Sequence, residues 1–190
     1  AASCLQWFAD SIVEQDLGEL MQALENFEVE SNSPYFLPYL SGERTPHNNP
    51  NAQGAFFGLG HSSTKLSMLH AVLEGVSFAF ADGVDALHAS GTKASEITLI
   101  GGGTKSDYWR QMLADILGLE LTYRLGGDVG PALGAARLAQ IALDTNATID
   151  SVCSQPELVS TYKQDASKAA HYAMRRSTFQ RLYANTKDLF

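Results

Sequence analysis

The stretch that most constrains the fold is ITLIGGGTKSDYWRQMLADILG, residues 97–118. It opens with a short run of β-branched and aliphatic residues that is typical of a buried strand. Three glycines follow at once, and helical spacing then begins at Ser106 and Asp107. Gly118 is the kind of residue that ends a helix. The stretch therefore predicts a strand over 96–101 and a helix over 106–117, joined by glycines.

The residues that follow repeat this order of elements. LELTYR (119–124) alternates as a second strand does, and LGGDVGP (125–131) reads as a turn. An alanine-rich helix is predicted over 132–143, with Pro131 in its tolerated first turn. Strands joined through helices pair in parallel, so we expect an α/β fold. Ligands of such sheets lie beyond the carboxyl ends of the strands, where the glycines are.

The rest of the chain is predicted to be mainly helical. Apolar spacing predicts helices over 2–16, 17–26, 65–89 and 167–189. An extended segment is expected over 34–40, a loop over 41–54, and an irregular polar linker over 144–166. Gly75 and Gly83 interrupt the long helix, and we expect them to let another element pack closely.

The three glycines have two local explanations, which the sequence leaves open. Glycine lets a ligand approach the backbone, and the start of a helix suits phosphate or other polar groups. Alternatively they form a tight turn, with Ser106 or Asp107 as the N-cap. A P-loop is excluded because no glycine precedes Lys105. A dinucleotide site is a weak match, because Ser106 replaces the third glycine and Arg124 stands where an acid is wanted.

Composition excludes some classes of function. The formal net charge is -8 and no basic cluster occurs, which argues against nucleic acid or an anionic membrane as a partner. Arg175 and Arg176 are expected on a solvated helix face. Cys4 and Cys153 are expected to be reduced thiols of a cytoplasmic protein. No apolar run is long enough for a membrane span.

The sequence contains few residues in patterns that indicate a catalytic site. The five histidines are scattered without zinc spacing, and His70 and His88 are expected at the core edge or surface. Asp128 is expected to be a turn residue. Glu74 falls in the apolar part of the long helix, so it needs a buried partner that the sequence does not identify. We therefore nominate no catalytic residue and no metal ligand.

Several stretches together resemble the carboxy-terminal domain of FGGY carbohydrate kinases. They are FLPYLSGERTPHNNPNAQGAFFGLGH, AVLEGVSFAFADG, ITLIGGGTKSDYWRQMLADILG and GGDVGPALGAARLA. The family's second signature maps onto Gly54, Phe56, Gly58, Leu59, Met68, Ala71, Val72, Leu73 and Glu74. Ser67 departs from that signature, which we interpret as a changed helix start. The YLSGERTPHNNP and GGDVGPALGAARLAQIA stretches most resemble the xylulose-phosphorylating members.

The resemblance implies a partial actin-like (ribonuclease H-like) ATPase domain. Residues 1–190 would be the carboxy-terminal nucleotide-binding domain of a two-domain sugar kinase, with the amino-terminal domain and the first part of this domain absent. ATP with Mg²⁺ would bind between the domains, and this chain would hold the adenosine. The family's adenosine-contacting positions fall on Ala2, Gln6, Gly101, Gly102, Gly103 and Ser106. Ala2 replaces a glycine found in glycerol kinases.

The same resemblance places the general base and most sugar contacts before residue 1. The chain lacks an initiator Met and starts within a predicted helix, so we expect a piece of a longer protein, inactive by itself. The expected partners are ATP, the sugar xylulose and the missing domain, with a homodimer as one assembly. The alternatives are another pentulose or glycerol-type kinase, a non-catalytic nucleotide-binding or interaction module, and a dinucleotide-binding protein.

Overall fold

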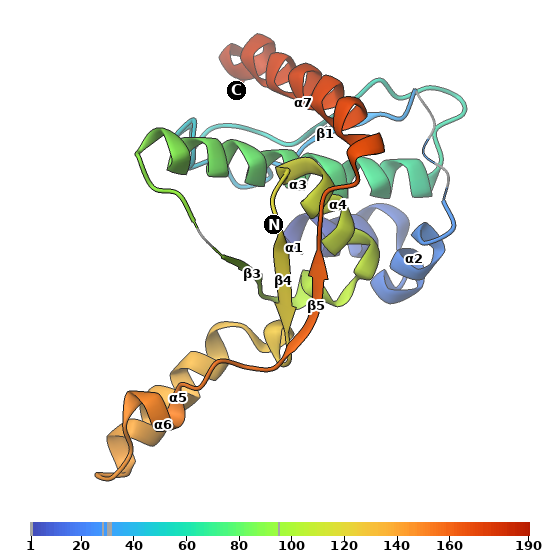
Figure 1. Cartoon of the computed structure of the whole chain (residues 1–190). Helices are drawn as coiled ribbons and strands as arrows, with labels where there is room; N and C mark the ends of the chain where they lie inside the picture. The colour runs from blue at the N-terminus through green and yellow to red at the C-terminus, as the bar shows by residue number, and fades with distance from the viewer. Residues whose placement is uncertain (1, 28, 30–31, 95) are drawn as a thin grey trace.

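The computed structural model describes residues 2–27, 29, 32–94 and 96–190, with the side chain of Ala2 left out (Figure 1). The helices are α1 (Ala2–Trp7), α2 (Leu17–Leu24), α3 (Lys65–Ala89), α4 (Asp107–Leu117), α5 (Pro131–Leu143), α6 (Ile149–Val152) and α7 (Ala166–Thr186). The strands are β1 (Tyr35–Leu37), β2 (Ala55–Phe57), β3 (Ile97–Leu99), β4 (Leu121–Arg124) and β5 (Leu158–Tyr162).

The predicted strand–helix–strand unit is present. β3 and β4 pair in parallel, with Ile97 opposite Leu121, and α4 forms the crossover between them. β5 adds to β4 in antiparallel orientation, so the sheet order is β3–β4–β5. β1 and β2 form a separate antiparallel pair. The α/β expectation is confirmed, and the carboxyl ends of β3 and β4 lie at one edge of the sheet.

The segment 144–166 is not the irregular linker that the sequence predicted. It contains α6 and β5, and β5 places Tyr162 opposite Leu121 in the sheet. β5 is short, and three of its five residues are exposed. Val159, Thr161 and Tyr162 favour strands, so a local signal was present, and pairing with β4 completes the strand.

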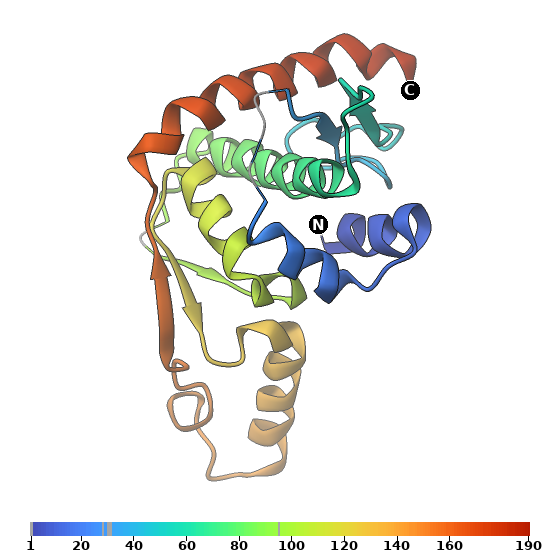
Figure 2. The same ribbon diagram turned by 90° about the vertical axis from the view of Figure 1, so that its right-hand side faces the viewer.

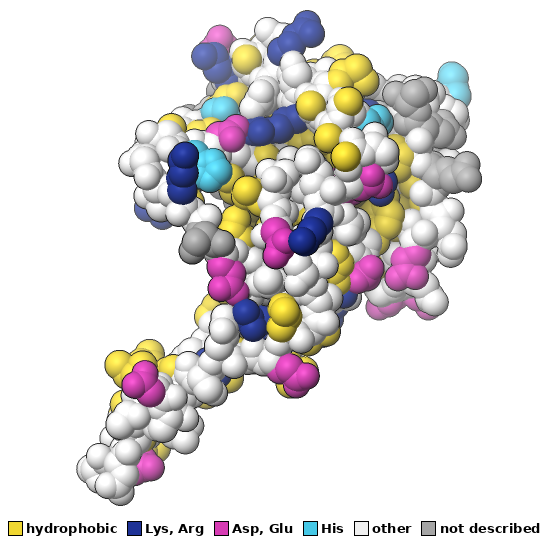
Figure 3. Space-filling model, viewed as in Figure 1, with side chains coloured by type: hydrophobic (Ala, Val, Ile, Leu, Met, Phe, Trp, Pro, Cys, Tyr) yellow, Lys and Arg dark blue, Asp and Glu magenta, His cyan; other side chains and the backbone are white. Residues whose placement is uncertain are grey.

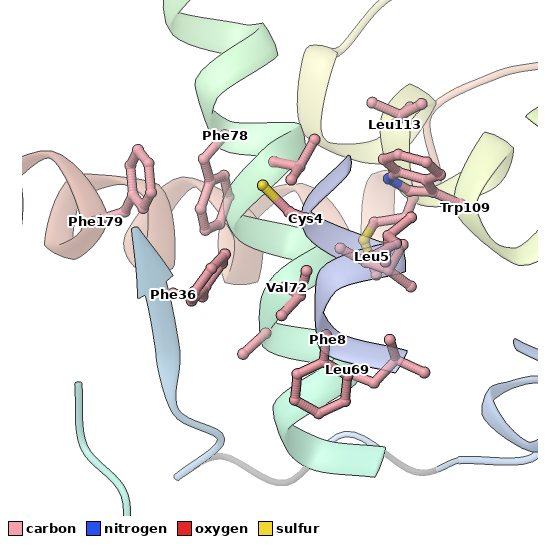
Figure 4. Close-up of a cluster of buried hydrophobic side chains, with 14 of the residues drawn as sticks. Cys4, Leu5, Phe8, Phe36, Leu69, Val72, Phe78, Trp109, Leu113 and Phe179 are labelled. Carbon is pink, nitrogen blue, oxygen red and sulfur yellow. The ribbon is translucent and has the colours of Figure 1, made fainter. Parts of the chain in front are cut away.

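The first predicted helix, 2–16, divides into two kinds of helix. α1 is followed by a π-helical segment from Phe8 to Val13, which ends at Glu14 with a left-handed φ of 50°. Phe8, which Figure 4 shows in the core, and the next residue, Ala9, are both fully buried. The apolar spacing predicts a helix here but does not distinguish a π-helical turn from an α-helical one.

α3 lies at the centre of the molecule, and in Figure 2 the long α7 runs above it. Thr64 and Ser67 form a capping box at its start, so Ser67 takes part in starting the helix, and its interpretation as a change from the family's helix start stays a prediction. A Cβ on Gly75 would lie 2.1 Å from the carbonyl oxygen of Phe36, so β1 does approach the helix there. Gly83 has open space, so the same expectation was wrong for it.

The expectation that Arg175 and Arg176 lie on a solvated helix face is wrong. Arg175 is buried, and its Nε and Nη2 lie 2.6 and 2.7 Å from the carboxylate oxygens of Glu74. It also donates to the carbonyls of Ser33 and Pro34. Arg175 is thus the buried partner that Glu74 requires, and it fastens α7 to α3. Arg176 Nη2 lies 2.6 Å from carboxylate oxygens of Asp82 and Asp85.

α5 and α6 project from the rest of the molecule (Figures 1 and 2). No residue of α5 is buried, and yellow apolar side chains are visible on this projection in Figure 3. Leu138, Leu143 and Ile149 are 69%, 88% and 70% exposed. Among the described residues, no helix combines the length and the apolarity needed to cross a membrane.

Candidate functional site

Two glycine-rich turns meet at the carboxyl ends of β3 and β4. The first, residues 101–105, is called the glycine turn, and Gly102–Lys105 within it form a short 3-10 helix. The second covers residues 126–130. The Gly101 N–H donates to the Gly127 carbonyl over 2.7 Å, and Lys105 Nζ lies 3.7 Å from Asp128 Oδ2. These contacts hold the two turns together.

The three glycines of the first turn are under different structural constraints. Gly101 has a φ of 101°, which other residues resist. A Cβ on Gly103 would lie 2.3 Å from Cζ3 of Trp109, so the packing forbids it. Gly102 has neither a positive φ nor any atom within 4 Å of such a Cβ. The fold therefore requires Gly101 and Gly103, whereas Gly102 leaves open space beside the backbone.

Ser106 begins the helix that follows the glycines. Its Oγ accepts from the Trp109 backbone N–H over 3.2 Å, which makes it the N-cap of α4. The first turn of α4 thus adjoins the glycine turn. The positive end of the helix dipole favours electron-rich ligand groups at this place.

A cavity of about 360 Å³, called the α2 cleft, separates α2 from the glycine turn. On the α2 side it is lined by Gly18, Met21 and Gln22 of the helix and by Glu25 at its C-cap, which follow one another at helical spacing. Its apolar lining includes Leu5, Met21 and Trp109, and its polar lining consists of Gln22, Glu25, Lys105 and Ser106. A flat apolar group with polar edges suits this combination of side chains.

A second cavity, of about 370 Å³, lies on the other side of the glycine turn and shares Trp109 with the α2 cleft. Its walls come mainly from apolar residues of α3, β3 and α4, such as Phe80, Val84 and Leu113. Apart from the turn itself, it offers few polar side chains. The α2 cleft is therefore the better candidate for a polar ligand.

The structure brings together part of the predicted set. Gly102, Gly103 and Ser106 line the α2 cleft, and Gly101 lines the second cavity. Gln6 is exposed and does not line the cleft, and its Nε2 donates to both carboxylate oxygens of Asp10 over 2.8 and 2.9 Å. Ala2 lies in α1, and its side chain is outside the described residues.

Sequence reasoning missed the contribution of α2. The spacing of Gly18, Met21, Gln22 and Glu25 marks one helix face, but Leu17, Leu20, Met21 and Leu24 mark an apolar face just as clearly. Which face turns toward the glycines depends on how α2 packs against α3 and the π-helical segment. No local pattern carries that information.

The described residues contain no group of three or more His, Cys, Asp or Glu side chains that could hold a metal ion. Asp128, which the sequence predicted to be a turn residue, pairs with Lys105.

The comparisons with known proteins agree with one another. Residues 1–143 match the model described as the FGGY family of carbohydrate kinases, C-terminal domain. The chain is 52% identical to the xylulose kinase of Escherichia coli strain K12, over 96% of the chain and 38% of that protein. It is 49% identical to the xylulose kinase of Klebsiella pneumoniae, over 100% of the chain and 39% of that protein.

Solved structures give the same result. A kinase from Brucella ovis, named a xyloylose kinase, has a TM-score of 0.85 at 36% identity, over 100% of this chain and 39% of that one. The xylulose kinase from Rhodospirillum rubrum has a TM-score of 0.80 at 28% identity, over 100% of this chain and 38% of that one. The described fold is thus part of an actin-like ATPase domain, and the chain spans about two fifths of the length of its curated relatives. The chain belongs to the FGGY family of carbohydrate kinases.

Proposed function

We propose that this chain supplies the adenosine side of the ATP site in a kinase that converts D-xylulose into D-xylulose 5-phosphate. The α2 cleft carries the proposal. It lies beside the glycine turn that follows the carboxyl end of β3, next to a glycine with open space and at the start of a helix. This is where open α/β sheets bind their ligands.

The side chains around the cleft fit a nucleoside. The apolar surfaces of Leu5, Met21 and Trp109 suit a flat base, and Gly102 lets that base approach the backbone. Gln22 and Glu25 offer hydrogen-bonding groups to the edge of the base or to ribose hydroxyls. Gln6 and Ala2 remain proposed contacts, and Gln6 would have to leave Asp10 to reach the ligand.

The charge around the cleft is compatible with phosphates beyond the nucleoside. Lys105 and the first turn of α4 supply positive potential near the glycine turn. Bound Mg²⁺ would neutralise the developing charge of the transferred phosphoryl group. We place the general base, the remaining phosphate contacts and most sugar contacts in the rest of the enzyme.

The choice of xylulose depends on the similarity to xylulose kinases at 52% and 49% identity. A gluconate kinase from Lactobacillus acidophilus shares the fold at 26% identity and a TM-score of 0.77. The fold therefore accommodates different sugars, and gluconate is the second candidate substrate. A cytoplasmic location is part of the proposal, and both cysteines are free thiols.

Calorimetric titration of the chain with ADP and ATP, and with NADPH as a control ligand, tests the proposal. We expect saturable adenine-nucleotide binding and none of NADPH. Gly102→Val places a side chain where the base would lie, so it should weaken binding at least about tenfold. Gly60→Val is the matched control, because Gly60 also has open space and no positive φ.

Equal loss of affinity in the two glycine variants would contradict the α2 cleft as the site. The same titration with Gln6→Ala tests the proposed contact of Gln6, which should lower affinity if the amide exchanges Asp10 for the nucleotide. Preference for NADPH over ATP would support the dinucleotide alternative.

A further inference from the structure

Trp109 supports the glycine turn from beneath. It is 4% exposed and lines both the α2 cleft and the second cavity, so it forms the wall between them. Figure 4 shows its side chain pointing from α4 into the core. The ring takes the space that a Cβ on Gly103 would need, at 2.3 Å from that position. The position of the indole therefore determines where the backbone of the turn can lie.

Ser77 of α3 holds the indole in this orientation. The Trp109 Nε1–H donates to Ser77 Oγ over 2.9 Å, and both groups are buried. The Ser77 hydroxyl in turn donates to the Leu73 carbonyl over 2.7 Å, one helical turn earlier. Its proton is thus committed to Leu73, and its lone pair faces Trp109. A hydroxyl held at both ends fixes the direction of the indole N–H.

The turn above the ring has its own short-range hydrogen bonds. The Thr104 N–H and Oγ1 both donate to the Gly101 carbonyl, over 3.0 and 2.7 Å. The Ser106 N–H donates to Gly103 at the edge of bonding distance, 3.4 Å. These bonds lie within the turn. Its contacts with the core are the buried Thr104 and the packing of Gly103 against Trp109.

We propose that Ser77 is a positioning residue for the nucleotide site, which acts by holding Trp109 against Gly103 and so fixes the glycine turn. The inference rests on the proposed function, since the turn is the surface on which the base would lie. Ser77 itself does not line the α2 cleft. Its effect on a ligand passes through the indole and the backbone of the turn.

A purely structural role for Ser77 predicts a different pattern. If the hydroxyl merely satisfied a buried N–H, its loss would destabilise the chain and affect all protected amides alike. A positioning role predicts a local change in the glycine turn, beyond any change elsewhere. Amide hydrogen exchange of the ligand-free chain separates the two.

The first experiment compares exchange in the 190-residue chain and in its Ser77→Ala variant, with amides of β1 and β2 as the internal reference. We expect the Thr104 and Ser106 amides to exchange about tenfold faster relative to that reference. Thr186→Ala is the matched control, because Thr186 Oγ1 makes the same bond to a carbonyl one turn earlier, 2.8 Å from Leu182, without an indole. It should leave the turn unchanged.

The second experiment measures ADP affinity by calorimetry. Trp109→Phe removes both the N–H and the outer indole atoms Cζ3 and Cη2 that lie against Gly103, so it reports loss of the whole indole support even if Ser77→Ala does not fold. We expect each variant to weaken ADP binding about fivefold to tenfold, and the double variant to weaken it no further. Additive losses would overturn the coupling of Ser77 to Trp109.

Fluorescence supplies a direct signal. In a Trp7→Phe background Trp109 is the only tryptophan, so its emission reports on the indole alone. Ser77→Ala removes the polar partner of the indole N–H, so it should change the position of that emission maximum. A folded Ser77→Ala chain with unchanged emission and unchanged exchange in the turn would overturn the inference. If the unmodified chain binds no ADP, the proposed function fails, while exchange and emission still decide the role of Ser77.

Discussion

The guanidinium of Arg175 and the carboxylate of Glu74 form a buried ion pair across 101 residues of sequence. Burial raises the pKa of Glu74, and hydrogen bonding and charge from Arg175 oppose that rise. The arginine also satisfies the Ser33 and Pro34 carbonyls, so one side chain connects α7, α3 and the segment before β1. Such a pair is costly to break, because the remaining charge has no partner.

Arg175→Ala should lower the free energy of unfolding by about 3–5 kcal/mol, measured by chemical denaturation. Arg181→Ala on the same helix is the control, because Arg181 is exposed. It should change stability by less than about 0.5 kcal/mol. Equal small effects in both variants would mean that α7 is not fastened to α3 through this pair.

His70 gives the chain a pH-dependent stability. Its ring is fully buried, with Nδ1 2.9 Å from the Tyr108 hydroxyl. Burial, followed by the positive charges of Arg175 and His171, lowers the pKa of His70 to about 3. Between about pH 6.5 and pH 3 the unfolded chain therefore binds a proton at this residue that the folded chain does not. The free energy of unfolding must fall as the pH falls through that range.

When the pH is lowered from 7.5 to 5, the free energy of unfolding should fall for the unmodified chain and for His70→Gln. We expect the fall to be about 1–2 kcal/mol smaller for His70→Gln. Denaturant titrations at both pH values measure this difference. His88→Gln, on the exposed end of the same helix, should keep the original pH dependence. The pKa of His171 is also lowered by burial and by Arg175, but His171 is present in all three chains.

Among the elements, α3 contains two glycines whose surroundings differ. Gly75 lies where the backbone of β1 crosses the helix, and Gly83 faces open space. Gly75→Ala should lower the free energy of unfolding by at least about 2 kcal/mol, because backbone must move to admit the methyl group. Gly83→Ala should raise it by about 0.5–1 kcal/mol through helix propensity. Thermal unfolding measures both effects. A change of the unfolding temperature in the same direction in both variants would contradict this prediction.

The success of prediction also differed between elements. Long periodic segments such as α3 and the β3–α4–β4 unit were recognised because their patterns are local. β5 and α6 were missed because both are short, and the strand formers Val159, Thr161 and Tyr162 lie in a largely exposed segment without clear apolar alternation. The π-helical segment Phe8–Val13 was missed because apolar spacing indicates a helix without distinguishing its α and π forms.

For the molecule as a whole, the described residues provide one side of a candidate site and no nominated catalytic base. We therefore expect the 190-residue chain to bind adenine nucleotides without phosphorylating xylulose. A coupled assay for ADP release in the presence of xylulose, Mg²⁺ and ATP measures this. Sugar-dependent turnover above that of a Gly102→Val control would refute the division of roles.

The sequence by itself determined the order of the central elements, the place of the glycines at a strand end, and the family. These features depend on spacing and composition over a few neighbouring residues. Only the tertiary structure decided that the fold requires glycine at positions 101 and 103, whereas position 102 has space for a side chain. It also decided that Gln22 and Glu25 line the cleft beside the glycine turn. It also decided that Arg175 is buried against Glu74. These outcomes depend on contacts between residues far apart in the chain, which local periodicity does not encode.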